Sequence, residues 1–391
     1  MLSLKLGQSA EKLQLDFAKW LKANPPPAVV RRLDLESFVE ISTKWQRQLA
    51  SERWVAVHWP EEFGGRGLSL VEEALIQQML AEVNSPQLIN LFGITMVGPV
   101  LIEHGSQEQK KRFLSKILSA EEIWCQGFSE PQAGSDLASL GTRADRVQDG
   151  LRVFWRINGQ KVWTSFAQYA DWCFMLARTD VNARKHEGLS YFLVPMEASG
   201  ICVKPLMQIS GDDEFNEVFF EDVEVEQENI VGNLGDGWKI AISTLMYERV
   251  VLTFARHLQS HAALKDSAEV LRQLPNNDQS LASFGRLLAK NMAIRALAIN
   301  HLIAYSEGAT PGPEGSLDKL IWSETFQEIC SFALELLGDW APITGGADSV
   351  RDGIHQYRYL YSRGRTIAAG TSEIQRNIIA ERILGLPRTA N

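Results

Sequence analysis

The pattern of hydrophobic and polar positions divides the chain into three parts. In the first part, stretches such as residues 71–83 and 107–118 mix Leu, Ile and Ala with Glu, Gln and Lys, which predicts helices. Loops rich in Pro and Gly interrupt this part at residues 25–27 and 59–67. Near Trp124 the pattern changes to short aromatic and β-branched runs, and after residues 235–237 the helical pattern returns and continues to the end.

The middle part has the pattern of an antiparallel sheet. Apolar runs at residues 172–176, 191–194 and 218–225 are separated by polar or Gly-containing segments. Asn158-Gly159 lies between two further β-forming runs, and this dipeptide is the strongest short-range signal for a hairpin turn. The region therefore predicts a β domain of about a hundred residues, a typical domain size. In the last part, residues 273–280 and 308–315 are predicted loops.

Composition narrows the class of protein. The chain of 391 residues is too long for one compact core, and its net charge of -9 argues against a general nucleic-acid binder. The four cysteines form no CxxC pair, so neither a zinc site nor a disulfide framework is predicted. Apolar runs fall short of the roughly 20 residues that span a bilayer, and the first residues do not resemble a signal peptide. We therefore expect a cytoplasmic protein with no membrane span.

Several common catalytic motifs are absent from the sequence. It contains no strand-linked GxGxxG and no GxxxxGK[ST], so a Rossmann or P-loop nucleotide site is not expected. HExxH and GxSxG are also missing, and the seven histidines show no ligand spacing. No metal site is predicted.

The segment at residues 126–136 is small, polar and turn-forming, and it opens the predicted β domain. Backbone N–H groups in such a loop can face an anion or the polar edge of a heterocycle. Residue chemistry alone favours an ordinary Asx/Pro turn. Ser129-Glu130-Pro131 followed by residues 133–136 is, however, similar to the flavin-binding signature of acyl-CoA dehydrogenases.

Other motifs in the same order strengthen this resemblance, which covers nearly the whole chain. They lie at residues 60–65, 158–165, 370–377 and 383–387. The resemblance implies an α+β fold, with an N-terminal helical domain (residues 1–122), a central antiparallel β domain (123–232) and a C-terminal four-helix bundle (233–391). It also implies an FAD-dependent enzyme that takes one hydrogen each from the α and β carbons of an acyl-CoA substrate.

The resemblance further implies roles for particular residues. Trp163 should cover the flavin ring, although a place in a hairpin core is also compatible with this residue. Ser135 should lie where flavin and thioester meet, and it is therefore expected in both sites. The other expected FAD-binding residues are Gln126, Gly127, Phe128, Ser129, Gly134, Thr164, Ser165, Thr371, Ser372 and Glu373. Arg249 and Gly370 are expected to bind the substrate.

The catalytic base is the main departure from the family pattern. Most members carry a glutamate where this chain has Ala369, which cannot accept a proton. A minority carry the base on the first long helix after the β domain, and Glu248-Arg249 matches that pattern. Glu248 also falls on a helical stripe, shared with Trp238, Ala241, Leu245, Leu252 and Ala255. The residues alone leave a solvated Glu-Arg pair equally open; the resemblance favours Glu248 as the base. The small Ala369 predicts an acyl group that is bulky, branched or functionalised near the thioester, and the resemblance to subgroups of the family adds dicarboxylic and steroid acyl groups.

The sequence also predicts a partner chain. The family usually extends an Arg-x-x-Phe-Gly segment and a Gln-x-x-Gly-Gly segment to the neighbouring subunit's flavin. Residues 274–280 lack the first, and acidic Glu335 and Asp339 occupy the second. The steroid side-chain and pimeloyl-CoA dehydrogenase subgroups, which the chain resembles, suggest a heterotetramer with a homologous second subunit. A homo-oligomer that uses Arg272 or Arg286 instead is the alternative. Electron-transfer flavoprotein is the expected acceptor.

Two other functions fit the same fold. A flavin monooxygenase or oxidase would need no base placed for α-proton removal, so Glu248 counts against it. A non-catalytic partner subunit would explain Ala369, but the motifs around Ser129 and Trp163 count against it.

Overall fold

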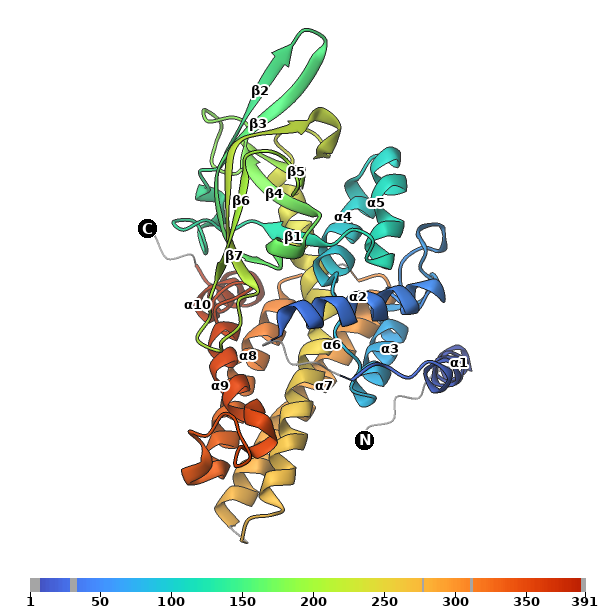
Figure 1. Cartoon of the computed structure of the whole chain (residues 1–391), viewed down its shortest axis with the longest axis vertical. Coiled ribbons are helices and arrows are strands. Elements are labelled where there is room, and N and C mark those ends of the chain that lie inside the picture. The colour runs from blue at the N-terminus through green and yellow to red at the C-terminus, as the bar shows by residue number, and fades with distance from the viewer. Residues whose placement is uncertain (1–7, 29–33, 276–277, 310–311, 388–391) are drawn as a thin grey trace. The chain divides into compact units, whose positions relative to one another are not determined.

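The computed structural model describes residues 8–28, 34–275, 278–309 and 312–387, and of residues 8 and 249–253 only the backbone. The chain forms two compact units, Met1–Glu248 and Arg249–Asn391. Figure 1 shows helices at both ends of the chain and strands in its middle part, as the sequence predicted.

Helices make up the first part of the first unit: α1 (Gln8–Ala23), α2 (Leu35–Ser51), α3 (Leu70–Glu82), α4 (Gly98–His104) and α5 (Gln107–Ser119). Capping boxes begin two of them. Ser69 and Glu72 bond each other's backbone N–H at the start of α3, and Ser106 and Gln109 do the same at the start of α5. These caps satisfy N–H groups that have no partner inside a helix, and both predicted helices are confirmed.

The sheet has the strands β1 (Trp124–Gly127), β2 (Arg143–Asp149), β3 (Arg152–Ser165), β4 (Trp172–Arg178), β5 (Leu189–Pro195), β6 (Ile201–Leu206), β7 (Phe215–Glu226) and β8 (Ile230–Val231). Its order is β6-β7-β3-β2-β4-β5-β8, with β1 beside β4. Most pairs are antiparallel, but β1 runs parallel to β4, as does the short contact of β2 with β4. The long β2–β3 excursion between β1 and β4 is the kind of connection that parallel pairing requires.

The predicted turn at Asn158-Gly159 is wrong. β3 continues through it as one strand, and the hairpin turn lies at Gly150 and Leu151, between the paired residues Asp149 and Arg152. Gly150 has a φ of 58°, the left-handed conformation that such turns use.

Asn158 makes cross-strand bonds in place of a turn. Its side chain accepts from the backbone N–H of Asp222 at 2.9 Å and donates to the Asp222 carboxylate at 3.0 Å. Gly159 is needed for close approach, because a Cβ there would lie 2.4 Å from Thr142 Oγ1. The dipeptide therefore marks an irregularity in the β3–β7 ladder.

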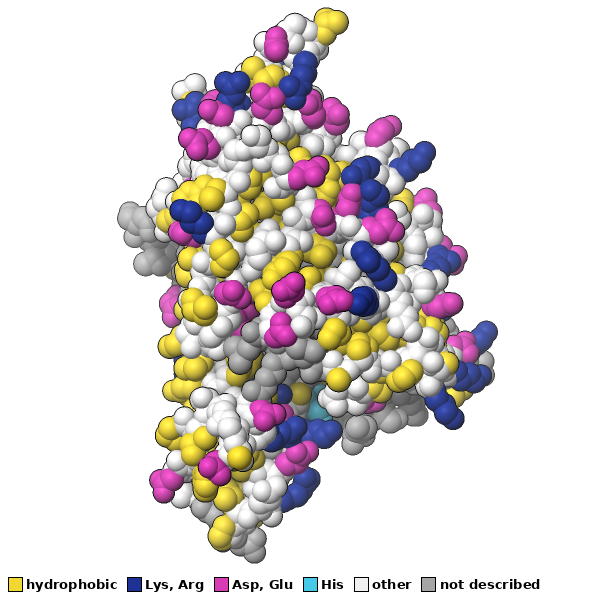
Figure 2. Space-filling view, in the orientation of Figure 1, with side chains coloured by type: hydrophobic (Ala, Val, Ile, Leu, Met, Phe, Trp, Pro, Cys, Tyr) yellow, Lys and Arg dark blue, Asp and Glu magenta, His cyan; other side chains and the backbone are white. Residues whose placement is uncertain are grey.

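The β2–β3 hairpin projects from the sheet (Figure 1). Figure 2 shows acidic and basic side chains gathered on it, and Arg152 bonds Glu224 and Glu226 of β7 there. Leu151 at the turn is fully exposed.

Both faces of the central strands are buried, and neighbouring residues along each strand serve different cores. On β4, Phe174 and Leu176 belong to a core shared with the N-terminal helices. Cys173 and Met175 face a second core, made with Trp155 and with side chains of β7. This alternation is the period of two expected for strands.

The second unit contains the rest of α6 (Gly237–Leu271), which begins in the first unit, with α7 (Asp278–Ser306), α8 (Glu314–Leu337), α9 (Ile354–Arg365) and α10 (Ser372–Ile378). Its core is built around Trp322, Phe326 and Ile329 of α8. Part of each predicted loop is helical, since α7 begins at Asp278 and α8 at Glu314, and residues 276–277 and 310–311 of these loops lie outside the described residues. Among the described residues, no helix combines the length and apolar character that crossing a membrane requires.

Candidate active site

The segment at residues 126–136 begins as strand and ends as an open loop. Gly127 lies tight against β4, because a Cβ would approach Cys173 Sγ to 2.8 Å. Phe128 is buried, with its ring edge-on to Phe174 at 5.8 Å. Gln126 and Ser129 are half-buried, whereas Gly134 and Ser135 are exposed. The start of this segment is therefore fixed by packing, and its end faces solvent.

The same segment is bonded to strand β3. The backbone N–H of Val162 donates to the carbonyl of Ser129 at 2.9 Å. Glu130 and Ala133 close a tight turn through two reciprocal backbone bonds. The Glu130 carboxylate is buried, which opposes its charge, but the Lys161 ammonium and neighbouring N–H donors hold the pKa of Glu130 below its usual value.

Trp163 lies at a bulge in β3 beside this segment. Lys161 pairs with Val218 and Thr164 with Asn216, so Val162 and Trp163 together oppose a single residue of β7. Trp163 has a φ of 61°, and the residue is 60% exposed. Positive φ is costly for a bulky residue, and bulges near functional sites re-aim side chains. Phe215 supports the indole edge-on, with ring centroids 5.9 Å apart.

The two residues after Trp163 differ in how far their side chains are exposed. The Thr164 side chain is fully buried, and its carbonyl accepts from Asn216 Nδ2 at 3.0 Å. The Ser165 side chain is half-buried. Thr164 thus has no exposed hydroxyl to offer a ligand, whereas Trp163 presents most of its ring.

These residues fit a planar aromatic heterocycle. The exposed indole offers a stacking face next to the loop. In the described part of the chain, the backbone N–H of Ser129 donates to no other backbone group, so it can bond the polar edge of a ring. Gly134 leaves the loop's open end unobstructed, since a Cβ there would meet no atom within 4 Å.

Glu248 lies at the end of the first unit, on α6. The helix starts close against β5, because a Cβ on Gly237 would lie 2.6 Å from Ser190 Cα. The buried face of this first stretch contains Ile240, Ala241 and Thr244. Glu248 follows Thr244 by one turn and is half-buried.

The predicted stripe is therefore only partly right. Ala241 is buried, but Trp238, Leu245 and Ala255 are half-buried, and the Leu252 side chain lies outside the described residues. The buried face of α6 is displaced by about one residue from the predicted stripe, because Ile240 and Thr244 pack on the sheet. There Thr244 Oγ1 bonds the Tyr191 hydroxyl at 3.4 Å. The Arg249 side chain is also outside the described residues.

Two contacts fix the turn of α6 next to Glu248 onto α4. The Tyr247 hydroxyl donates to Glu103 Oε2 at 2.7 Å, and burial raises the pKa of this phenol. His104 Nε2 lies 3.2 Å from Ser243 Oγ. The backbone that carries Glu248 is thus tied to both the sheet and a neighbouring helix.

The remaining predicted residues belong to the second unit. Ala369 and Gly370, with φ of 56° and 89°, form the turn before α10. The Gly370 carbonyl accepts from the buried Lys319 ammonium at 2.6 Å and from Gln375 Nε2 at 3.2 Å. Thr371 caps α10, Ser372 is buried and Glu373 is exposed. The Gly370 carbonyl is therefore already occupied by two donors of its own unit.

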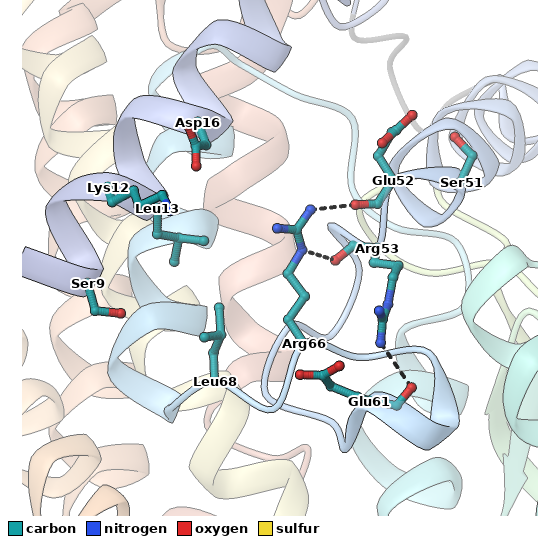
Figure 3. Close-up of a pocket in the computed structure, with 10 residues that line it drawn as sticks. All are labelled: Ser9, Lys12, Leu13, Asp16, Ser51, Glu52, Arg53, Glu61, Arg66 and Leu68. Carbon is teal, nitrogen blue, oxygen red and sulfur yellow. Dashed lines mark hydrogen bonds between the residues drawn. The ribbon is translucent and has the colours of Figure 1, made fainter.

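A pocket of about 520 Å³ lies elsewhere in the first unit (Figure 3). None of the predicted site residues lines it. Arg66 donates to the carbonyls of Glu52 and Arg53, and Arg53 donates to that of Glu61. Both guanidinium groups therefore hold backbone, and burial together with the nearby Arg53 lowers the pKa of Arg66.

Phe215 and the Lys161–Glu130 pair were not predicted as parts of the site. The position of Lys161 directly before the apolar pair Val162-Trp163 could have indicated from the sequence that this lysine is buried near the site. No sequence pattern pointed to Phe215, because its contact depends on the bulge.

Comparison with known proteins gives matches for all three parts of the chain. Residues 9–121, 125–223 and 235–384 match the N-terminal, middle and C-terminal domains of acyl-CoA dehydrogenase. Over 353 residues the chain is 41% identical to acyl-CoA dehydrogenase IpdE1 of Mycolicibacterium smegmatis, with 88% of each protein covered.

Solved structures agree with this. A structure of the ChsE4-ChsE5 complex from Mycobacterium tuberculosis superposes with a TM-score of 0.85 and 27% identity, over 99% of this chain and 100% of the other. The Tcur3481-Tcur3483 steroid ACAD gives 0.85 and 26% over the same shares. The fold predicted from the sequence is confirmed.

Proposed function

Since this chain belongs to the acyl-CoA dehydrogenase family, whose members are oxidoreductases that act on acyl-CoA, we propose that it binds FAD and dehydrogenates an acyl-CoA thioester between its α and β carbons. The product is the trans-2-enoyl-CoA. The observation that carries this proposal is the bulge at Trp163, which presents an exposed indole beside the loop bonded to it through Val162 and Ser129.

Different residues of the chain would bind different parts of the FAD molecule. Backbone groups of residues 126–129 would face the polar edge of the ring, Trp163 would cover one side, and Ser165, two residues further along β3, would lie beside the ring. Residues 371–373 of the second unit would hold the ribityl-phosphate part. A bound flavin would supply the acceptor for the β hydrogen and its electron pair.

Glu248 acts as the base. Its carboxylate takes the α proton as the double bond forms and the β hydrogen leaves with its electron pair, so the substrate loses two electrons and two hydrogens in all. Ala369 cannot serve in this role, and Glu248 lies on a stretch of α6 that is bonded to both α4 and β5. A fixed backbone is what a general base needs in order to meet one particular proton. Ser135, Gly370 and Arg249 bind the thioester.

The substrate is a bulky, branched, dicarboxylic or steroid acyl-CoA. Ala369 leaves room where a glutamate stands in most of the family. The name of one similar structure, a steroid ACAD, supports a steroid side chain.

The chain works with a homologous second subunit, as the two-chain names of the similar structures suggest. Glu335 and Asp339 are exposed at the C-terminal end of α8, where the helix dipole is also negative, so this end repels a pyrophosphate. Residues 276 and 277 of the other departing segment lie outside the described residues. We place this heterotetramer in the cytoplasm, with electron-transfer flavoprotein as the acceptor.

Anaerobic titration tests the function directly. The purified protein, with its partner where one co-purifies, should be yellow, and a bulky acyl-CoA should bleach its flavin absorbance under nitrogen. Protein that stays colourless even when it is co-expressed with the homologous subunit and supplied with FAD would count against the proposed function. A yellow protein that acyl-CoA does not bleach would indicate an oxidase or monooxygenase.

A further inference from the structure

Lys161 places a positive charge in the interior of the β domain. Its side chain is 0% exposed, and its ammonium lies 2.8 Å from Glu130 Oε1 and 3.2 Å from the carbonyl oxygen of Phe128. Burying such a pair costs several kcal/mol of desolvation, and apolar residues of similar size often stabilise a fold as well or better. Core packing alone is therefore a weak explanation for this lysine.

Through its carboxylate, Glu130 connects three segments of the chain. Besides Lys161, its carboxylate accepts from the backbone N–H of Gly141 at 2.6 Å and from that of Thr142 at 2.9 Å. The pair thus joins the loop that starts at residue 128, the strand β3 and the entry to β2. Trp163 follows Lys161 by two residues, so one ion pair links the loop to the bulge.

The Phe128 contact has a directional consequence. In a trans peptide the C=O and the following N–H point in opposite directions. The Phe128 carbonyl faces the Lys161 ammonium, so the N–H of Ser129 faces away from it. The Ser129 carbonyl in turn is held by Val162 N–H. The orientation of the Ser129 N–H is thereby fixed from both sides.

A charged donor also changes the strength of the next bond. Hydrogen bonds in a chain polarise one another, and those that involve an ion are stronger than neutral ones. With an ammonium on the carbonyl of its peptide group, the N–H of Ser129 becomes a better donor toward a negatively charged acceptor.

We propose that Lys161 is a positioning residue that acts through the Phe128–Ser129 peptide, aiming and strengthening the Ser129 N–H toward the flavin edge that gains negative charge on reduction. This inference rests on the proposed function. It assigns to Lys161 the tuning of flavin affinity and reduction potential, with Glu130 keeping the ammonium charged in the interior.

The decisive variant is the double substitution Lys161→Met with Glu130→Gln. Lys161→Met alone strands a buried carboxylate and can prevent folding, whereas the double variant removes both charges and keeps similar volumes. Arg152→Met is the matched control, because it removes a cation from the same strand at an exposed ion pair. Each protein is measured as isolated, with its partner chain where present, for thermal midpoint, FAD dissociation constant and flavin midpoint potential.

We expect the double variant to fold, to bind FAD about tenfold more weakly and to have a more negative flavin potential, since a charge-assisted donor has become a neutral one. Arg152→Met should match the wild type in both flavin readouts. A folded double variant with wild-type affinity and potential would show that the pair is only structural. The wild-type protein is measured first: if it takes up no FAD even in complex with the homologous subunit, both the proposed function and this inference are overturned.

Discussion

Trp163 and Phe215 meet edge to face across the β3–β7 pair, with centroids 5.9 Å apart and ring planes at 82°. Such a contact contributes about 0.5–1.5 kcal/mol beyond burial, and here it braces a residue with a positive φ. Phe215→Ala should therefore weaken FAD binding by roughly 2- to 10-fold, as measured by flavin fluorescence titration. Phe219→Ala is the control, because Phe219 lies on the same strand against Lys204. Equal losses in both variants would contradict a specific brace.

Glu248→Gln should abolish proton removal while leaving the flavin and acyl-CoA sites intact. We expect flavin reduction to slow by about 10³-fold, since general bases contribute about 10²–10⁴. Stopped-flow absorbance under nitrogen measures the rate, and binding of an acyl-CoA product checks the site. Glu103→Gln, which removes the nearby carboxylate that accepts from Tyr247, should cost far less. Near-wild-type reduction by Glu248→Gln would refute the assignment.

The space at Ala369 should be visible in substrate preference. We expect higher kcat/KM for steroid, branched or dicarboxylic acyl-CoA esters than for short unbranched ones. Ala369→Gly preserves the space and suits the positive φ at this position, so it should keep that order. If short unbranched esters are used as well as every bulky ester tested, the size argument fails.

Expression of this chain alone should give protein with weakly bound or substoichiometric flavin. Co-expression with the homologous subunit should restore one full set of flavin and the activity. The reason is the negative charge of Glu335 and Asp339 at the end of α8. Flavin content per protein and mass by light scattering measure both results. A fully flavin-loaded, active homotetramer of this chain would end the idea, and Arg272 or Arg286 would then be the first residues to test as donors.

His257 should make the second unit sensitive to acid. Burial, with help from His261 and Arg295, lowers the pKa of His257 to about 4, against about 6.5 when unfolded. Between these values only the unfolded chain binds the proton, so the free energy of unfolding falls as pH drops from 6.5 to 4, by at most roughly 3 kcal/mol. Urea unfolding at several pH values measures this slope, and His257→Gln should flatten it.

His301 provides the opposite case. Its hydrogen bond to Asp318 raises its pKa, so its contribution is complete below pH 6.5 and is lost as pH rises through the folded value. His301→Gln should therefore leave the acid slope in place. A slope that disappears with His301→Gln and persists with His257→Gln would reverse the assignment.

The sequence predicted the elements well where local chemistry decides them. Ser69 and Ser106 begin helices through caps formed within four residues, and β4 and β5 read directly from apolar runs. Asn158-Gly159 misled because the same two residues suit a turn and a bulge. Only the pairing with Asp222, 64 positions away, selects the bulge.

In the candidate site, too, some features could be predicted from local sequence and others could not. The family motifs predicted that the segment at residues 126–135 and Trp163 belong to one site. The structure places them side by side, since the N–H of Val162 donates to the carbonyl of Ser129. Lys161 and Phe215 depend on which way side chains leave a bulged strand, which no local pattern encodes. The roles of Glu248 and of residues 370–373 stay predictions.

The β2–β3 hairpin offers a practical handle on this protein. Its turn, Gly150-Leu151, projects beyond the sheet with Leu151 fully exposed, while pairing is complete up to Asp149 and Arg152 (Figure 1). Exposed loop tips are among the places in a fold where inserted residues are best tolerated. An affinity peptide placed between Gly150 and Leu151 should therefore leave the strands paired and both chain ends untouched. Such a tagged chain could be used to search cells for the proposed partner subunit with the termini still available for assembly.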